Sequence, residues 1–286
     1  MSEPTRPVLR WYGGKWRLAP WVIKHFPPHL VYVEPFGGAA SILLRKPMVA
    51  AEVYNDLDGR LVNLFRVLRD PEKASDLRRR VELTFFSRAE FNWSYGEPVD
   101  DIDDAHRMIV LSFMGQGSDS VTRHCPTGFR AKMSDGKAMP SQAWASWPQS
   151  IPQFTKRLRN VTVEQCDATI LIDRMDSIGT LFYVDPPYLP ETRKNGIRKH
   201  GYRHELTEND HVALLDRLNG ARGMVVLSGY PSTLYDMALQ GWHRVETSAL
   251  ADRAQIRTEV LWLNEACVAG LDGHRDQREL FKRVAE

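Results

Sequence analysis

One continuous apolar run, Thr180–Val184, leads directly into the turn Asp185-Pro186-Pro187-Tyr188. A strand that is apolar on both faces is typical of a parallel sheet covered by helices on both sides. Ligands of such sheets bind outside the carboxyl ends of the strands, so this turn is expected to lie in a binding site. The two prolines make the turn rigid by fixing φ. With a carboxylate, a free carbonyl and an aromatic ring, the turn suits a flat heterocycle that carries an exocyclic amine.

Two short β-α units near the N-terminus extend this pattern. Residues 30–33 predict a strand, and after a glycine turn the small and apolar residues 39–44 predict the opening of a helix. Residues 50–54 predict a second strand, and apolar residues then recur at helical spacing over residues 57–68. Consecutive β-α units this short indicate a parallel sheet with crossover helices.

The later part of the chain predicts the rest of the sheet and a change in its direction. Further strands are predicted at residues 161–165, 224–227, 242–247 and 258–263. Thr207 and Asp210 resemble a capping box in front of a helix, but no helix separates the last two strands. The predicted fold class is therefore α/β, with a Rossmann-like, doubly wound, mostly parallel sheet that ends in an antiparallel hairpin.

Residues 70–155 interrupt the alternation of strands and helices. They include an apolar helix candidate at residues 105–114 and a stretch rich in Gly, Ser, Thr and Arg at residues 115–137. This pattern predicts an inserted, mainly helical subdomain with one long loop or hairpin. The predicted organisation is a main domain of residues 1–69 and 156–270, the insert of residues 70–155, and a polar tail of residues 271–286.

Composition and charge narrow the possible partners. The 286-residue chain has no apolar run near the roughly 18 residues of a membrane span, and its first residues lack the apolar core of a secretory signal. The three cysteines are widely spaced, which argues against disulfides and structural zinc and fits a reducing cytoplasm. Residues 121–204 carry 13 Lys and Arg against 7 Asp and Glu. This basic middle fits either a nucleic-acid surface or a solvated face.

Two glycine turns predict a cofactor site. Phe36-Gly37-Gly38 follows the first strand, where glycine lets the backbone approach a ligand closely. Asp56 lies 19 residues after Gly37, the usual place of a carboxylate that binds ribose hydroxyls. The turn Trp-Tyr-Gly-Gly-Lys at residues 11–15 offers backbone groups and one cation that suits a carboxylate.

The order of these motifs resembles that of the Dam-like adenine-N6 DNA methyltransferases, in their phage-type branch. The matching segments are Trp-x-Gly-Gly-Lys at 11–15, Glu-Pro-Phe-x-Gly at 34–38, Asn-Asp-Leu-Asp at 55–58, Asp-Pro-Pro-Tyr at 185–188, and residues 202–206 and 227–230. The resemblance covers nearly the whole chain and implies S-adenosylmethionine as cofactor, with no metal. The residues that it implies for cofactor binding are Trp11, Gly14, Lys15, Glu34, Phe36, Gly37, Asp56, Asp167 and Asp185. One departure is Ala40, where relatives often have a second glycine.

The resemblance also implies where each part of the cofactor lies. Lys15 would lie near the methionine carboxylate, and Glu34 would help to line the methionine end together with Phe36 and Gly37. Asp56 would hold the ribose hydroxyls. Asp167, which follows the predicted strand at residues 161–165, would accept the amine of the cofactor adenine.

Asp185, Pro186, Pro187 and Tyr188 would form the catalytic pocket for a target adenine. The Asp185 carboxylate and the Pro186 carbonyl would accept both amine hydrogens and direct the nitrogen lone pair at the methyl group. The base would have to be flipped out of the duplex, and stacking on Tyr188 would recover about 1–3 kcal/mol of that cost. The predicted function is site-specific N6 methylation of adenine in double-stranded DNA. We expect a monomer with no membrane or obligatory protein partner.

Two polar, basic segments are the predicted DNA contacts. Those in the insert either read bases in the major groove or hold only phosphates; they are Ser118, Arg123, Thr127, Arg130 and Lys132. Those after the catalytic turn form either a backbone-binding loop or a plain surface loop; they are Arg193, Lys194, Arg198, Lys199 and Arg203. The run of three arginines at residues 78–80 is more typical of a solvated helix face.

Three other functions share parts of this pattern. Cytosine-N4 transfer uses a related pocket that more often begins with Ser, so Asp185 favours adenine. Protein glutamine methylation uses a Pro-Pro-Tyr turn that usually begins with Asn, and it does not need a basic insert. A catalytically silent DNA-binding relative would have no reason to keep both the turn at residues 185–188 and Asp56.

Overall fold

The computed structural model describes residues 3–131, 139–193, 201–251 and 255–274. Four of the predicted DNA contacts, Lys132, Lys194, Arg198 and Lys199, lie outside the described residues. Within the described ranges, no helix is long and apolar enough to cross a membrane.

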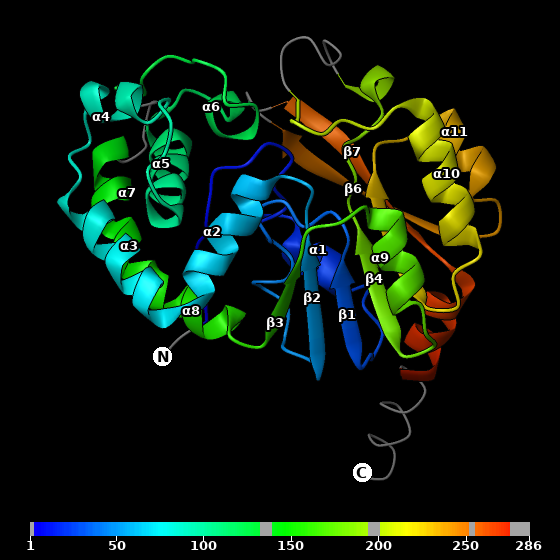
Figure 1. The fold of residues 1–286 in the computed structure, drawn as a ribbon. Coiled ribbons are helices and arrows are strands. Elements are labelled where there is room, and N and C mark those ends of the chain that lie inside the picture. The colour runs from blue at the N-terminus through cyan, green and yellow to red at the C-terminus, as the bar shows by residue number, and fades with distance from the viewer. Residues whose placement is uncertain (1–2, 132–138, 194–200, 252–254, 275–286) are drawn as a thin grey trace, which may run out of the picture.

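A seven-stranded sheet forms the centre of the molecule (Figure 1), with the strand order β3-β2-β1-β4-β5-β7-β6. The strands are β1 (Val31–Glu34), β2 (Ala51–Asn55), β3 (Val161–Glu164), β4 (Thr180–Val184), β5 (Met224–Gly229), β6 (His243–Ala251) and β7 (Gln255–Leu263). The strands from β3 to β5 in this order run parallel to one another, whereas β7 runs antiparallel to both β5 and β6. The predicted fold class is confirmed, including the antiparallel hairpin at its end.

Helices surround the sheet and form most of the insert. They are α1 (Ala19–Ile23), α2 (Gly59–Arg69), α3 (Pro71–Leu83), α4 (Arg88–Trp93), α5 (Asp101–Met114), α6 (Asp119–Thr122), α7 (Pro140–Ser146), α8 (Ile151–Leu158), α9 (Ala168–Met175), α10 (Glu208–Asn219) and α11 (Thr233–Ala238), with the 3-10 turns η1 (Trp147–Ser150) and η2 (Pro190–Thr192). The predicted capping box at the start of α10 is present, with Thr207 and Asp210 bonded to each other's backbone N–H.

Two hydrophobic cores lie on the two faces of the sheet, because successive residues of a strand point to opposite sides. Phe182 and Val184 of β4 pack in one core with residues of α9, α10 and α11. Tyr183, between them, belongs to the other core, with residues of α1, α2 and the insert helices. Helices therefore cover both faces (Figure 1), which is why β4 is buried at every position.

The helices from α3 to α8 gather beside α2 at one end of the sheet (Figure 1), so the insert is mainly helical, as predicted. A buried ion cluster ties α8 to the sheet. Glu52 of β2 accepts a hydrogen bond from Lys46 at 2.6 Å and a bidentate pair from Arg157 of α8 at 2.5 and 2.9 Å. The exact domain limits at residues 69–70 and 155–156 stay a prediction.

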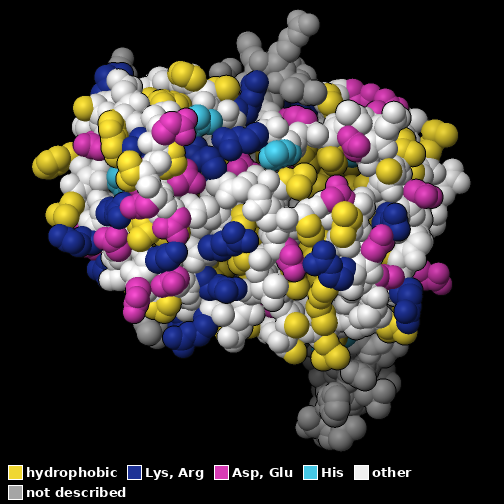
Figure 2. Space-filling model, in the orientation of Figure 1, with side chains coloured by type: hydrophobic (Ala, Val, Ile, Leu, Met, Phe, Trp, Pro, Cys, Tyr) yellow, Lys and Arg dark blue, Asp and Glu magenta, His cyan; other side chains and the backbone are white. Residues whose placement is uncertain are grey.

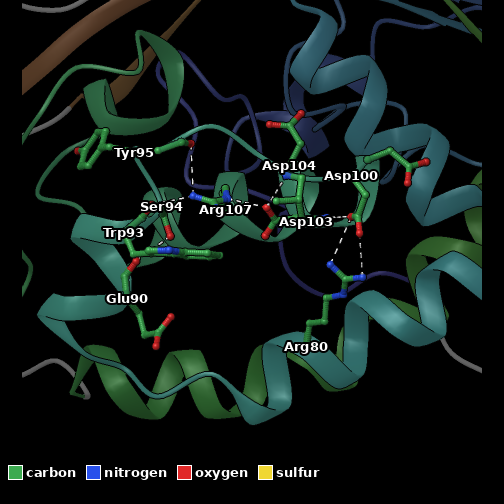
Figure 3. A network of polar contacts seen from close by, with 12 residues as sticks. Arg80, Glu90, Trp93, Ser94, Tyr95, Asp100, Asp103, Asp104 and Arg107 are labelled. Carbon is green, nitrogen blue, oxygen red and sulfur yellow. Dashed lines mark hydrogen bonds and ion pairs between the residues drawn. The ribbon is translucent and has the colours of Figure 1, made fainter.

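Arg107 organises the connection between α4 and α5 (Figure 3). Its buried guanidinium donates to Asp103 at 2.7 Å and to the Trp93 carbonyl at 2.7 Å, and it lies 3.5 Å from the centre of the Trp93 ring. Asp100 caps the first turn of α5 and pairs with Arg80 of α3 at 3.2 Å. Because a buried charge is costly without its partner, this network fixes the positions of α4 and α5 relative to each other.

The prediction of a helix opening at residues 39–44 was wrong. These residues form successive turns, and Ala40 has a left-handed φ of 51°. A residue with a Cβ is disfavoured in this conformation, which interrupts a right-handed helix. The left-handed φ also gives a physical reason for glycine at this position in the family that the sequence resembles.

The predicted polar tail begins inside a helix. Residues 265–274 are helical, and Leu271 packs against one of the two cores. The run of arginines at residues 78–80 lies on α3, where Arg78 pairs with Glu82 and Arg80 pairs with Asp76. These arginines therefore lie on a helix face with ion pairs of their own.

Candidate functional site

A cavity of about 270 Å³ opens where β1, β2 and β4 end. All nine residues that the sequence predicted for cofactor binding line it: Trp11, Gly14, Lys15, Glu34, Phe36, Gly37, Asp56, Asp167 and Asp185. Of the catalytic turn, Asp185 and Pro187 line the cavity, whereas Pro186 and Tyr188 do not. The structure therefore brings the predicted residues together at the carboxyl edge of the sheet.

The turn after β1 needs glycine at two positions. A Cβ on Gly37 would lie 2.2 Å from the Tyr54 ring, because the backbone passes directly against β2. Gly38 has a left-handed φ of 48°, and a Cβ there would lie 3.1 Å from the indole nitrogen of Trp11. Without these side chains, the turn lies close over the strand ends and its backbone forms part of the cavity wall.

Asp56 lines the cavity with a carboxylate that the backbone holds in place. Its Oδ2 accepts from Gly38 N at 2.9 Å and its Oδ1 accepts from Asp58 N at 2.9 Å. Burial raises the pKa of Asp56 to about 6, although these two hydrogen bonds act in the opposite direction. Because each carboxylate oxygen has two acceptor positions, both oxygens can also accept hydrogen bonds from ligand hydroxyls.

Glu34, at the end of β1, is only 2% exposed. Its Oε1 accepts from the Tyr32 hydroxyl at 2.6 Å and from Leu43 N at 2.7 Å. Burial raises the pKa of Glu34 to about 7, more than these hydrogen bonds and nearby Lys46 can lower it. A carboxyl group with this pKa changes its charge near neutral pH, so a cationic ligand would favour its ionised form.

Lys15 is a buried cation between the cavity and the catalytic turn, with 6% of its surface exposed. Its Nζ lies 3.1 Å from Asp185 Oδ1, donates to the Gly13 carbonyl at 3.0 Å, and lies 4.6 Å from the centre of the Tyr188 ring. Burial alone would lower the pKa of Lys15, but the carboxylates of Asp185 and Glu259 raise it overall. Burial raises the pKa of Asp185, and Lys15 opposes that shift. The two groups thus favour each other's charged forms, against the effect of burial on both.

Tyr188 is anchored through both its hydroxyl and its ring. The hydroxyl donates to Glu259 Oε2 at 2.9 Å and lies 3.0 Å from Ser228 Oγ. The ring makes a T-shaped contact with Tyr230, with a centroid distance of 4.6 Å. Tyr188 is partly exposed but does not line the cavity, so its exposed part lies outside it.

Two further polar side chains fix the loops after the strands. Asp167 caps α9 by accepting from Thr169 N at 2.8 Å, which holds its carboxylate at the cavity wall. Asn55 donates to the carbonyls of Pro35 and Cys166 at 2.8 and 3.0 Å and accepts from Cys166 N at 2.9 Å. It therefore ties together the loops that follow β1, β2 and β3.

The segment after the catalytic turn closes one side of the cavity. The Tyr202 hydroxyl donates to the Tyr12 carbonyl at 3.1 Å, and a Cβ on Gly13 would lie 2.2 Å from that hydroxyl. Arg203 lines the cavity and pairs with Asp58, the N-cap of α2, at 3.3 Å. The structure thus places Arg203, a predicted DNA contact, in the lining of the cavity.

Arg193, another predicted DNA contact, is buried. Its guanidinium forms two hydrogen bonds with Glu205, both of 2.8 Å, and it lies 5.6 Å from the centre of the Tyr202 ring. With 5% of its surface exposed, Arg193 joins the segments on either side of residues 194–200 through its pair with Glu205. A nearby acidic partner at Glu205 was the sequence signal for this role.

The polar stretch of the insert is closed as a hairpin. Gly115 and Phe129 form an antiparallel bridge, flanked by a 2.7 Å hydrogen bond from Arg130 N to the Met114 carbonyl. Tyr95 supports it: its hydroxyl accepts from Thr127 N at 3.2 Å and lies 3.2 Å from the Cys125 carbonyl.

The predicted DNA contacts in this part of the insert differ in accessibility. Arg123, Thr127 and Arg130 are partly exposed, whereas Ser118 is buried at the start of α6. Burial at Ser118 does not fit a contact with DNA. Figure 2 shows Lys and Arg side chains mixed with Asp and Glu over this face, with several gathered near the upper centre, close to the start of α2.

The sequence did not predict that Glu259 and Ser228 contact the Tyr188 hydroxyl, or that Asn55 ties the loops after the strands together. Ser228 and Asn55 lie within motifs that were recognised, but no role was assigned to them. The signal for Glu259 was a single carboxylate inside the apolar β run of residues 258–263. Within the described residues, no group of His, Cys, Asp and Glu is arranged to hold a metal ion.

A Rossmann-like sheet with an antiparallel end, a glycine turn after β1 and a carboxylate after β2 place this chain among the α/β folds that bind ligands at the carboxyl edge of the sheet. Comparison with known families agrees: the family model of D12 class N6 adenine-specific DNA methyltransferases matches residues 11–246. The chain belongs to this family.

Similar proteins carry names that agree with this family. A DNA adenine methylase of Salmonella typhi is 23% identical over 236 residues, covering 81% of this chain and 83% of that protein. One of Vibrio cholerae is 25% identical over 247 residues, covering 83% and 85%. One of Serratia marcescens is 25% identical over 194 residues, covering 66% and 68%. The predicted activity, adenine-specific DNA methylation, is thus the activity of the family.

Proposed function

We propose that this protein transfers a methyl group from S-adenosylmethionine to N6 of an adenine flipped out of double-stranded DNA. The observation that carries the proposal is the position of Asp185, which lines the cofactor cavity and begins the turn that continues to Tyr188. One carboxylate therefore lies between a site for the donor and a site for the acceptor.

The lining of the cavity suits S-adenosylmethionine. Gly37 and Gly38 line it without a side chain, and Phe36 adds an apolar surface. The carboxylates of Glu34 and Asp185 suit the ammonium and sulfonium of the ligand, and Asp56 suits its ribose hydroxyls. When bound, this cofactor supplies a methyl group that is already activated by the positive charge on sulfur.

Asp185 would activate the acceptor amine. In the structure its Oδ1 lies 3.1 Å from Lys15 Nζ, which favours the ionised form against the effect of burial and fixes the direction of the carboxylate. An ionised carboxylate accepts a hydrogen bond from the amine, and the Pro186 carbonyl is the second predicted acceptor. Two such bonds draw the nitrogen toward tetrahedral geometry, so its lone pair is available to the methyl group.

The target adenine would reach this turn only after leaving the duplex, at a cost of a few kcal/mol. Tyr188, which is partly exposed outside the cofactor cavity, provides an aromatic surface for it. Stacking on such a surface would return about 1–3 kcal/mol. The partly exposed Arg123, Thr127 and Arg130 of the insert hairpin are proposed to contact the DNA around the flipped base.

The test is transfer of label from the methyl-labelled cofactor to DNA, with the product base identified after hydrolysis. We expect N6-methyladenine from the wild-type protein. Asp185→Asn should lower kcat by about 10²–10³-fold, the usual cost of removing one preorganised electrostatic group. Asp216→Asn, an exposed carboxylate of α10, is the matched control and should leave kcat unchanged. Label in N4-methylcytosine or in protein, or near-normal turnover by Asp185→Asn, would contradict the proposal.

A further inference from the structure

Glu259 is a buried carboxylate that lies outside the catalytic turn of residues 185–188. It lies on β7, is 7% exposed, and accepts a hydrogen bond from the Tyr188 hydroxyl at 2.9 Å. Its strand runs antiparallel to β5, and the pairing of Gly229 with Val260 brings Glu259 beside the carboxyl end of β5. It therefore reaches the site from a part of the chain that contributes none of the family motifs recognised in the sequence.

The hydrogen bonds around the Tyr188 hydroxyl define its orientation. Because the hydroxyl has one hydrogen and donates it to Glu259, the Ser228 hydroxyl, 3.0 Å away, donates to the Tyr188 oxygen. The oxygen is thus fixed by side chains from two neighbouring strands, β5 and β7. A ring fixed at this point can no longer swing about its Cα–Cβ bond.

The ring itself is confined by its neighbours. Lys15 Nζ lies 4.6 Å from its centroid, and Tyr230 meets it in a T-shaped contact. Arg257, two residues before Glu259 on β7, lies 5.2 Å from the centre of the Tyr230 ring. Since residues two apart on a strand point to the same face, β7 supports both Tyr188 and Tyr230.

Glu259 also acts on the charge of the site. Burial raises the pKa of Glu259, whereas Lys15 and the Tyr188 hydrogen bond lower it. Lys15 is thus attracted by two carboxylates, Asp185 and Glu259. The Glu259 carboxyl group accepts the Tyr188 hydrogen bond through Oε2, so it directs the Tyr188 hydroxyl toward β7.

From these contacts we infer that Glu259 is a positioning residue, which holds the Tyr188 ring as the stacking wall for the extruded adenine. This inference rests on the proposed function and adds a residue to it. Glu259 does not touch the reacting atoms; it acts through Tyr188. Its loss should therefore affect the step that uses the flipped base and leave cofactor binding intact.

The experiment compares Glu259→Leu, Glu259→Gln and Tyr188→Phe, each alone, and the double variant Glu259→Leu/Tyr188→Phe. Glu259→Leu should lower kcat at least 10-fold while the KM for S-adenosylmethionine changes less than 2-fold. Glu259→Gln keeps an oxygen that can accept the Tyr188 hydrogen bond, so it should retain most of the activity even if Glu259→Leu folds poorly. The double variant should be no slower than the slower of its two parent variants, because both changes remove the same interaction. Glu265→Leu, at an exposed position just after β7, is the matched control.

A second measurement follows the base directly. The substrate is a duplex with the sequence that the wild-type enzyme methylates, in which 2-aminopurine replaces the target adenine. This base becomes fluorescent when it is extruded from the duplex, and stacking on an aromatic ring quenches its fluorescence. Glu259→Leu should give a brighter complex than wild type at equal DNA occupancy. Equal brightness with unchanged kcat, or additive losses in the double variant, would overturn the inference and leave the proposed function standing. A wild-type protein that methylates no DNA would overturn the proposed function, and this inference with it.

Discussion

Glu34 offers a quantitative test of the buried charge at the cofactor cavity. Burial raises its pKa from 4.5 to about 7, and each pKa unit corresponds to 1.36 kcal/mol. The folded protein binds more protons than the unfolded chain between these two values, so its stability falls as pH rises through this window. Above pH 7, ionised Glu34 should therefore cost the folded protein about 3 kcal/mol.

The substitution Glu34→Gln removes this titration without removing the contacts. The Tyr32 hydroxyl and Leu43 N both donate to Oε1, and the amide oxygen of glutamine can accept both hydrogen bonds. The difference in the free energy of unfolding, variant minus wild type, should become more positive by about 2–3 kcal/mol between pH 5 and pH 8. The titration of Asp56 is present in both proteins and cancels in this difference.

Urea unfolding of both proteins at pH 5 and pH 8, without cofactor, measures this change. Glu82→Gln, an exposed carboxylate of α3, is the control and should show no pH-dependent difference. If the difference in the free energy of unfolding between Glu34→Gln and wild type is the same at both pH values, the argument that burial disfavours the ionised form of Glu34 is refuted. Calorimetry near pH 7 adds a second readout, because a cation bound beside Glu34 should release a proton from wild type and none from the variant.

Three further predictions test other parts of the structure. Arg107→Met should lower the free energy of unfolding by about 3–5 kcal/mol in urea titrations, because it leaves Asp103 as a buried charge without its partner; a loss below about 1 kcal/mol would contradict this. Ala40→Gly should change stability by less than about 1 kcal/mol, since relief of the left-handed φ of 51° is offset by greater freedom of the unfolded chain and a lost buried methyl. Arg193→Met should leave the salt dependence of DNA binding unchanged in fluorescence anisotropy, because a phosphate contact would reduce the slope by about 0.9; a reduction of that size would show that Arg193 contacts DNA.

Local patterns carried most of what the sequence could predict. The apolar run Thr180–Val184 emerged as β4 with the same limits, because burial on both faces leaves a signal that needs no knowledge of the rest of the chain. The nine residues predicted for cofactor binding could be assigned to one edge of the sheet because parallel strands end at the same edge. The prediction of a helix at residues 39–44 was wrong because Ala40 has a left-handed φ. Alanine is a good helix former, so the sequence carries no signal for this backbone angle.

The charged residues were harder to interpret than the motifs. Arg193 and Arg203 were predicted to contact DNA because they closely follow the turn at residues 185–188. In the structure Arg193 pairs with Glu205, whereas Arg203 pairs with Asp58 and lines the cavity. The pair Arg203–Asp58 joins residues far apart in the chain, so its existence depends on the tertiary fold and not on any local pattern.

The same limit explains why Glu259 was missed, and it indicates what the antiparallel hairpin contributes. In a purely parallel sheet, every strand delivers only its final residues to the catalytic edge. β7 is reversed and begins beyond the end of β5, so its middle residues lie at that edge, and Glu259 meets Tyr188 across β5. The reversal therefore supplies a carboxylate from the middle of a strand to a site that also draws on the ends of β1, β2 and β4. If Glu259 positions Tyr188, the end of the sheet has a part in catalysis as well as in stability.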